Sequence, residues 1–301
     1  MGSGDDMRLS EIMSERRRLI NLAYRLLGSV AEAEDAVQET YARWYAMTPE
    51  QQDAIESPRA WLVKVAGRVC LDLLGSARAR RERYVGDWLP EPVPGPAASS
   101  MVGVGDPVDR ITLDESVSMA FLVVLESMTP AERVSFVLHD VFRYSFAEVA
   151  EVVGRTPAAC RQLAFSARRR VGEVRAATPA ARQAAVVREF QKAWEAKDIG
   201  ALVGLLDPEA TATADSGGLA IAFTEPFVGA EEIAHAWVEI ADRIPEGMVF
   251  VERVVNGRPG LVAEQDGVVV TVLAFDVVGE RVARIWVIRN PEKLRAWGGP
   301  G

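Results

Sequence analysis

The stretch that decides the fold runs from Phe146 to Arg170 and reads FAEVAEVVGRTPAACRQLAFSARRR. Its first half places apolar residues at helical spacing and stops at Gly154, and glycine favours helix ends. Thr156 is suited to cap a second helix, and Pro157 suits the first position of that helix, where an N–H has no partner. Two short helices joined by a tight turn predict a helix-turn-helix, whose second helix enters the major groove in proteins that bind DNA.

The second helix of this motif carries side chains that suit DNA. Arginines greatly outnumber acids between residues 155 and 175. Arg161 and Gln162 fall off the apolar stripe, and side chains of these two types form bidentate hydrogen bonds with base edges. The surrounding arginines suit phosphates. The alternative is a solvated helical hairpin, because cations also stabilise the C-terminal end of any helix.

The distribution of charge indicates that this chain would bind DNA only weakly when alone. The 301 residues are enough for two or three domains and carry a net charge of −9. Only the segment around the helix-turn-helix, residues 129–175, is net positive. Because neutralisation of phosphates supplies much of the affinity for nucleic acid, we expect dimerisation or a larger partner to supply the rest.

Composition disfavours several other functional classes. No apolar run of about 18 residues and no apolar N-terminal segment occurs, so we expect a cytoplasmic protein without a membrane span. Cys70 and Cys160 lie on apolar faces of expected helices, and His139 and His235 are far apart in the sequence. We therefore expect no disulfide, no metal site and no cofactor.

The N-terminal part predicts a helical block. Apolar residues at helical spacing predict helices over residues 16–27 and 30–45, and Ser29 with Glu32 has the spacing of a capping box between them. A third helix begins at Ser57-Pro58 and carries basic residues along its outer side. Basic residues beside Trp61 suit single-stranded nucleic acid, although Trp61 is equally well explained as a core residue.

Four motifs stand along the expected N-terminal helices: LAYRLLGS at 22–29, AEDAVQET at 33–40, SPRAWL at 57–62 and LDLL at 71–74. They resemble region 2 of the extracytoplasmic-function (ECF) RNA polymerase sigma factors. MTPAER at 128–133 and the helix-turn-helix resemble sigma region 4.

The resemblance implies a role for each matching residue. The residues implied to bind RNA polymerase core are Asp35, Gln38 and Glu39. Those implied to open and read the minus-ten promoter element are Arg59, Trp61, Lys64, Arg68 and Asp72. Those implied to read the minus-thirty-five element as duplex are Arg155, Thr156, Ala158, Arg161, Gln162 and Arg168. The polymerase would then supply the affinity that the acidic chain lacks.

The segment 85–112 predicts an extended linker between these regions. Its density of prolines excludes a helix and favours polyproline-like structure. The aromatic area of Tyr84 and Trp88 favours burial, so we expect a docking surface for them elsewhere in the chain. Packing on the neighbouring helices is the alternative.

From Ala180 onward the pattern predicts an α+β domain. Short amphipathic helices come first, and strands are expected over residues 249–255, 260–265, 267–278 and 281–289. The order resembles a SnoaL-like domain of the nuclear-transport-factor-two superfold, a cone with a curved antiparallel sheet and an apolar pocket that could hold a small ligand. Relatives of that fold include isomerases and cyclases, for which the candidate residues here are Asp215, His235 and Asp276. We rank an enzyme low because fold alone does not establish function.

A further resemblance connects this tail to the linker. Sigma factors that carry a SnoaL-like extension have a linker motif and two tail motifs, matched here by WLPEP at 88–92, DSGGL at 215–219 and NPEKL at 290–294. The middle motif departs from the family, because Ser216 replaces a glycine and Leu219 replaces a lysine. The implied interdomain regulatory residues are Tyr84, Trp88, Leu89, Pro90, Asp215, Gly217, Gly218, Asn290, Pro291, Lys293 and Leu294.

The sequence therefore predicts a multidomain chain with two all-α sigma domains and an α+β SnoaL-like tail. The expected domains are region 2 at 1–84, the linker at 85–112, region 4 at 113–177 and the tail at 178–301. We expect a non-enzymatic sigma factor whose partners are RNA polymerase core and promoter DNA, with activity modulated in cis by the tail. The alternatives are a stand-alone regulator that senses a ligand, or a small-molecule isomerase or cyclase in the tail.

Overall fold

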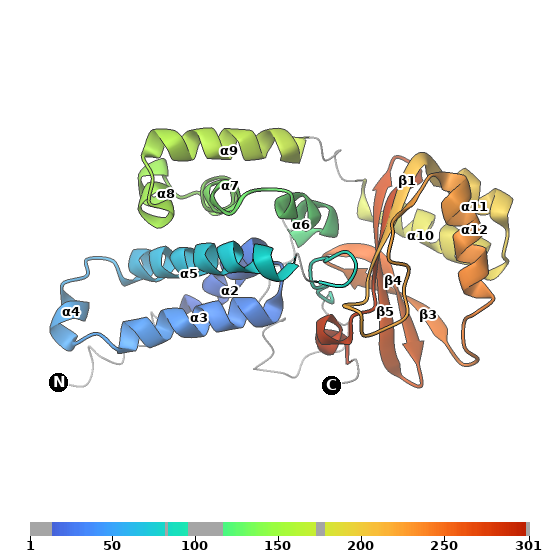
Figure 1. The fold of residues 1–301 in the computed structure, drawn as a ribbon, viewed down its shortest axis with the longest axis horizontal. Coiled ribbons are helices and arrows are strands. Elements are labelled where there is room, and N and C mark those ends of the chain that lie inside the picture. Colours follow the sequence, from blue (N-terminus) through green and yellow to red (C-terminus); the bar gives the residue numbers. More distant parts are fainter. Residues whose placement is uncertain (1–13, 82–83, 96–116, 173–177, 299–301) are drawn as a thin grey trace. The chain divides into compact units, whose positions relative to one another are not determined.

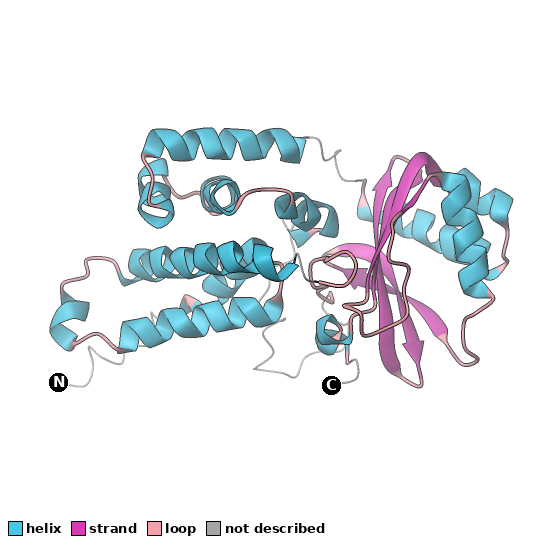
Figure 2. Ribbon diagram, in the orientation of Figure 1, coloured by secondary structure: helices cyan, strands magenta, loops and turns pink. Residues whose placement is uncertain are grey.

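The computed structural model describes residues 14–81, 84–95, 117–172 and 178–298. The chain divides into two compact units. The first holds the described residues 14–81 and 124–172, and the second holds 84–95, 117–123 and 178–298. Among the described residues, the first unit is helical and the named strands lie in the second (Figure 2). The fold class expected from the sequence is confirmed.

The first unit begins with the expected helical block (Figure 1). Its helices are α2 (Arg16–Leu27), α3 (Val30–Tyr45), α4 (Pro49–Asp53) and α5 (Pro58–Arg81). Gly28 ends α2 with a φ of 71°, which glycine adopts without steric penalty. The Ser29 hydroxyl accepts a hydrogen bond from the Glu32 amide at 3.3 Å and so caps α3. Helices α2, α3 and α5 pack their apolar faces into a common core.

The helix-turn-helix lies in the same unit. The helices that lead to it are α6 (Met119–Glu126), α7 (Pro130–Phe136) and η3 (Val137–Val141), followed by the pair α8 (Phe146–Val153) and α9 (Pro157–Gly172). Gly154 has a φ of 69° between the pair, and the Thr156 hydroxyl accepts from the Ala159 amide at 3.2 Å. The turn therefore has the glycine helix end and the threonine cap that the sequence predicts.

The second unit contains a six-stranded sheet with the strand order β2-β1-β6-β5-β4-β3. Its helices are α10 (Ala180–Glu195), α11 (Ile199–Leu205) and α12 (Ala230–Ala241), followed by the short turns η4 (Pro291–Lys293) and η5 (Arg295–Trp297). Its strands are β1 (Leu206–Asp215), β2 (Phe227–Val228), β3 (Val249–Val255), β4 (Arg258–Gln265), β5 (Val268–Val278) and β6 (Arg281–Ile288). Neighbouring strands are antiparallel except for β1 and β6, which are parallel. The sequence analysis identified β3 to β6 but neither β1 nor β2.

The two faces of this sheet carry different covers. Helices α10, α11 and α12 pack on one face around an aromatic core that includes Phe190, Trp194, Trp237 and Phe275 (Figure 1). The other face is apolar as well, and its cluster of Val262, Val272, Ala274, Trp286 and Ile288 packs with residues from outside the sheet: Leu89, Met119, Leu294 and Trp297. Part of the expected linker thus belongs to the core of the second unit.

No helix in the described parts of the chain is both long and apolar enough to span a membrane. Both cysteines are buried free thiols. Within the described residues no group of three or more His, Cys, Asp and Glu side chains is arranged to hold a metal ion.

Candidate polymerase, DNA and linker-binding surfaces

Helix α3 presents an acidic and polar outer surface. Asp35, Gln38 and Glu39 are all exposed, while Ala36 and Val37 between them are buried in the core. The Glu39 carboxylate pairs with a neighbouring arginine one turn along the helix at 2.8 Å, and such an exposed pair contributes little to stability. The three candidate core-binding residues therefore lie on one accessible helix face.

Helix α5 carries the residues implied for the minus-ten element, and the structure places them in different surroundings. Arg59 is exposed and pairs with Glu15 at 3.3 Å, and Asp72 is exposed. Trp61 is half-buried and makes an edge contact with Trp44, with ring centroids 5.2 Å apart. Its ring therefore contributes to the region 2 core while part of it stays accessible.

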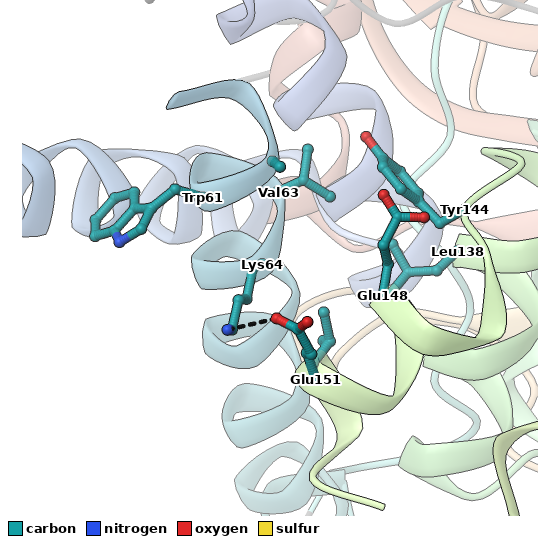
Figure 3. Close-up of a pocket in the computed structure, with 9 residues that line it drawn as sticks. Trp61, Val63, Lys64, Leu138, Tyr144, Glu148 and Glu151 are labelled. Carbon is teal, nitrogen blue, oxygen red and sulfur yellow. Dashed lines mark hydrogen bonds and ion pairs between the residues drawn. The ribbon is translucent and has the colours of Figure 1, made fainter. Parts of the chain in front are cut away.

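Lys64 and Arg68, the remaining cations of this set, contact the helix-turn-helix. The Lys64 ammonium pairs with the Glu151 carboxylate of α8 at 2.6 Å, as Figure 3 shows. The Arg68 guanidinium donates to the Glu151 backbone carbonyl at 2.8 and 3.3 Å. Sequence analysis did not find Glu151, because it lies 87 residues from Lys64 and its helix gave no sign of an internal partner.

Close packing brings α8 to this position on α5. A Cβ atom at Gly67 would lie 2.7 Å from a methyl carbon of Val152, so the two helices approach at a point where a larger residue would collide. Glycine in a helix interior costs about 1 kcal/mol relative to alanine. Beside this contact is a cavity of about 260 Å³ whose lining includes Trp61, Lys64, Tyr144, Glu148 and Glu151 (Figure 3).

The outer face of α9 carries most of the residues that the resemblance implies for base reading. Its N-terminal residues are all exposed: Arg155 and Thr156 in the turn, then Ala158, Arg161 and Gln162 in the helix. The Arg161 guanidinium lies 5.3 Å from the centre of the Phe146 ring, a cation–π contact that orients it. Arg168 differs, because it pairs with Asp140 at 2.7 Å.

Phe165 lies on the same face and was missed by the sequence analysis. Its side chain is 56% exposed, which is unusual for phenylalanine. It is one helical turn from Arg161, where apolar contact with a thymine methyl group is a known form of base recognition. The sequence signal for this residue was a phenylalanine at a position outside the apolar stripe of an amphipathic helix.

The linker motif and the two tail motifs meet in a buried polar cluster around Asp215. This carboxylate, which is fully buried at the end of β1, accepts from the Tyr84 hydroxyl at 2.6 Å, from the Leu89 amide at 2.8 Å and from Lys293 at 2.6 Å. It also accepts from the Gly217 amide at 3.1 Å. Four donors around one carboxylate satisfy a charge that would otherwise be costly to bury.

Lys293 and Asn290 complete this cluster. Lys293 is 7% exposed, donates to the Leu89 carbonyl and lies 4.0 Å from the centre of the Trp88 ring. Asn290 donates to the Tyr84 hydroxyl at 2.6 Å. Burial raises the pKa of the Tyr84 phenol, and the hydrogen bond that it donates to Asp215 raises that pKa further. The phenol is therefore a donor that stays protonated at neutral pH.

The remaining motif residues shape the cluster. Gly217 and Gly218 adopt φ values of 61° and 72°, and a Cβ at Gly217 would lie 2.5 Å from the Asn290 amide nitrogen. Pro90 is buried, Pro291 begins η4, and Leu294 is buried beneath the sheet. Leu219, at the position of the family's lysine, is 62% exposed.

A second anchor for the linker was not identified from the sequence. The Asn256 side chain accepts from the Val93 amide at 3.0 Å and donates to the Val117 carbonyl at 2.8 Å. The Trp297 indole donates to the Pro92 carbonyl at 2.8 Å. Pro94 forms an isolated antiparallel bridge with Val255 at the end of β3. The Asn256-Gly257 pair was interpreted only as a hairpin turn, which it also forms.

The three residues considered for catalysis in the tail do not share one environment. Asp215 belongs to the linker-binding cluster, His235 is exposed on α12, and Asp276 pairs with Arg284 on the neighbouring strand at 3.3 Å. The arrangement therefore lends no support to a common active site for them.

Two family models match the chain. Residues 12–80 match sigma-70 region 2, and residues 118–171 match sigma-70 region 4. The first match covers the α2–α5 block and the second covers the segment from α6 to the end of the helix-turn-helix.

Individual relatives extend this likeness to the whole chain. The chain is 38% identical over 300 residues to the ECF RNA polymerase sigma factor SigJ of Mycobacterium tuberculosis, with coverage of 96% of this chain and 93% of SigJ. It is 34% identical over 285 residues to the probable ECF RNA polymerase sigma factor SigI of the same organism, with 93% and 92% coverage. The crystal structure of M. tuberculosis SigJ matches with a TM-score of 0.77 at 36% identity, over 97% of this chain and 99% of that one.

Proposed function

We propose a division of labour among the surfaces of this chain, which belongs to the ECF sigma factors of RNA polymerase. Each surface contributes one part of directing the polymerase to promoters. The exposed face of α3 with Asp35, Gln38 and Glu39 binds RNA polymerase core. Its support is the combination of accessible polar side chains with a well-packed apolar face, which gives a partner a rigid surface.

We assign the two DNA elements to α5 and α9. The partly accessible Trp61 ring and the cations Lys64 and Arg68 suit a single strand, through stacking and phosphate contacts. The exposed α9 residues Arg161 and Gln162 suit base edges in the major groove. Because the net charge of the chain is −9, the nonspecific affinity comes from the polymerase.

The tail acts as a clamp on the linker between the two sigma regions. The observation that carries this proposal is the Asp215 cluster, in which one buried carboxylate accepts from Tyr84, Leu89 and Lys293. A fixed linker has fewer conformations than a free one, so it changes the effective concentration of one DNA-binding region near the other's site. Neither a bound ligand nor catalysis is needed for this role.

Arg161→Ala is expected to weaken binding of the holoenzyme to its promoter by roughly 1–3 kcal/mol, because a base-reading side chain is lost. The measurement is run-off transcription and promoter binding with reconstituted holoenzyme. The matched control is Arg188→Ala, which removes an exposed arginine of the tail that pairs with Glu252 at 3.2 Å. Equal discrimination between promoter and scrambled templates by Arg161→Ala and wild type would contradict the assignment.

Trp88→Ala is expected to loosen the linker from the tail, because the variant removes the aromatic face beside the buried Lys293 ammonium. A desolvated cation–π contact is worth about 2 kcal/mol. Limited proteolysis should therefore cut residues 84–95 faster in the variant. Leu219→Ala, a change at an exposed residue of the tail motif, is the control. Unchanged protection of the linker in Trp88→Ala would remove Trp88 from the clamp.

A stand-alone DNA-binding regulator is the competing function, and one experiment separates the two. Electrophoretic mobility of promoter duplex is measured with the chain alone, with core polymerase alone and with both. A sigma factor shifts the promoter specifically only when core is present. Specific binding by the chain without core would favour the regulator and would overturn the proposed function.

A further inference from the structure

The two α5 cations to which we assign DNA binding, Lys64 and Arg68, already have an internal partner. The Lys64 ammonium lies 2.6 Å from the Glu151 carboxylate, and Arg68 donates two hydrogen bonds to the Glu151 backbone carbonyl. Figure 3 shows the Lys64 and Glu151 side chains pointing toward one another from α5 and α8. One residue thus offers two oxygen acceptors to the same two cations that are proposed to bind DNA phosphates.

The neighbouring packing fits a stable contact between these two helices. Gly67 lies one residue before Arg68, and the methyl groups of Val152 approach it more closely than a side chain there would allow. The hydrogen bond from Lys64, together with its charge, lowers the pKa of the Glu151 carboxyl below its ordinary value. The carboxylate is therefore ionised at neutral pH and offers Lys64 the same charged oxygen chemistry as a phosphate.

This contact is incompatible with simultaneous binding of both promoter elements. The minus-thirty-five and minus-ten elements are named for their positions, which are about 25 base pairs apart. At about 3.4 Å per base pair, this separation is about 85 Å along a duplex. Region 2 with α5 and region 4 with α8 cannot span that distance while Lys64 touches Glu151. The contact must break before the promoter is fully engaged.

We propose that Glu151 of region 4 is an intramolecular competitor of DNA that masks Lys64 and Arg68 until the sigma factor engages its promoter. This proposal rests on the DNA-binding role assigned to those two cations. The Lys64–Glu151 ion pair is weak, because the two side chains are 35% and 60% exposed. Exposed ion pairs of this kind contribute little to stability. Breaking this ion pair therefore adds little to the cost of separating α8 from α5.

The first test measures binding of the free full-length chain to a labelled oligothymidine strand by fluorescence anisotropy at low salt. Glu151→Gln is expected to bind roughly two- to fivefold tighter than wild type, the gain expected from releasing one exposed ion pair. The control is Glu148→Gln, which removes the same charge one turn earlier on α8 from a side chain lining the same cavity. Glu148→Gln should show no comparable gain. An equal gain in both variants, or none in Glu151→Gln, would overturn the mask.

A double-mutant comparison separates the mask from the DNA-binding role on which it rests. In a Lys64→Ala/Arg68→Ala background, the gain from Glu151→Gln is expected to disappear, because no cations remain to be released. Persistence of the gain would overturn the mask. If Lys64→Ala/Arg68→Ala leaves oligothymidine binding unchanged even in the Glu151→Gln background, the assignment of these cations to DNA fails, and the mask fails with it.

A structural readout is available in the wild-type chain. A carbodiimide joins an ammonium and a carboxylate in direct contact through an amide bond, with loss of water as the reagent is converted to its urea. The Lys64–Glu151 cross-link should form in the free chain and decrease in the complex of holoenzyme with promoter DNA, as measured by peptide mass spectrometry. Equal yields in the two states would show that the contact persists on the promoter and would overturn the proposal. A decrease together with unchanged DNA binding by Lys64→Ala/Arg68→Ala would place the failure in the DNA-binding role.

Discussion

Replacing Asp215 by alanine is expected to lower the free energy of unfolding of the second unit by about 3–5 kcal/mol, the usual effect of breaking a buried ion pair from one side. Asp215 has no solvent exposure, and Lys293, its ion-pair partner at 2.6 Å, is 7% exposed. The substitution leaves that ammonium without its counter-charge and removes the acceptor for Tyr84 and Leu89. Urea unfolding followed by tryptophan fluorescence measures the loss.

The double variant Asp215→Ala/Lys293→Met provides the control for this interpretation. Replacing the lysine by a residue of similar length and no charge removes the uncompensated cation, so the double variant should be more stable than Asp215→Ala alone. If Lys293→Met destabilises the chain by the same amount in the presence and absence of Asp215, the two side chains are not coupled. The expected order of stability is wild type, then the double variant, then Asp215→Ala.

Arg133→Met is expected to lower the stability of the first unit by about 3–5 kcal/mol. Arg133 is 3% exposed, pairs with Glu126 at 2.7 Å and donates to the Leu26 carbonyl of α2 at 2.9 Å. Burial lowers the pKa of Arg133 to about 9, which still leaves the guanidinium charged at neutral pH. Methionine preserves much of the buried volume but provides no donor. Thermal and urea unfolding of the full chain measure the change.

Arg170→Met is the matched comparison for Arg133→Met. Arg170 also donates to a backbone carbonyl, that of Ser127 at 2.5 Å, but its side chain is 39% exposed. Solvent replaces the lost partner at such a position, so the expected loss is under about 1 kcal/mol. Equal destabilisation by the two substitutions would show that burial does not account for the contribution of Arg133 to stability.

The parts of this fold that depend on local chemistry could be predicted from the sequence. Ser29 and Thr156 each accept a hydrogen bond from an amide three residues later, and Gly28 and Gly154 provide the positive φ at helix ends. Such signals act within one helical turn, so neighbouring residues suffice to identify them. The same periodicity predicted which faces of α9 and α3 are exposed, whereas the roles proposed for those faces came from the resemblance to sigma factors.

The parts of the fold that depend on pairing between distant residues could not be predicted from the sequence. Strand β1 has the sequence LDPEATATAD, which contains two threonines but no valine, isoleucine or aromatic residue, and it is held in the sheet by parallel pairing with β6. Glu151 and Asn256 act on partners 87 and up to 163 residues away. Their roles come from the tertiary structure, which no local pattern encodes.

The distance along the chain between linker and tail has a consequence for the order of events during synthesis. Tyr84 hydrogen-bonds to Asn290, which follows it by 206 residues, and Leu89 accepts from Lys293 across 204 residues. On the ribosome, both promoter-reading regions are complete well before the residues that hold the linker have been translated. Contacts between residues so far apart in the chain form slowly. Each newly synthesised molecule therefore passes through a stage in which the tail has not yet bound the linker.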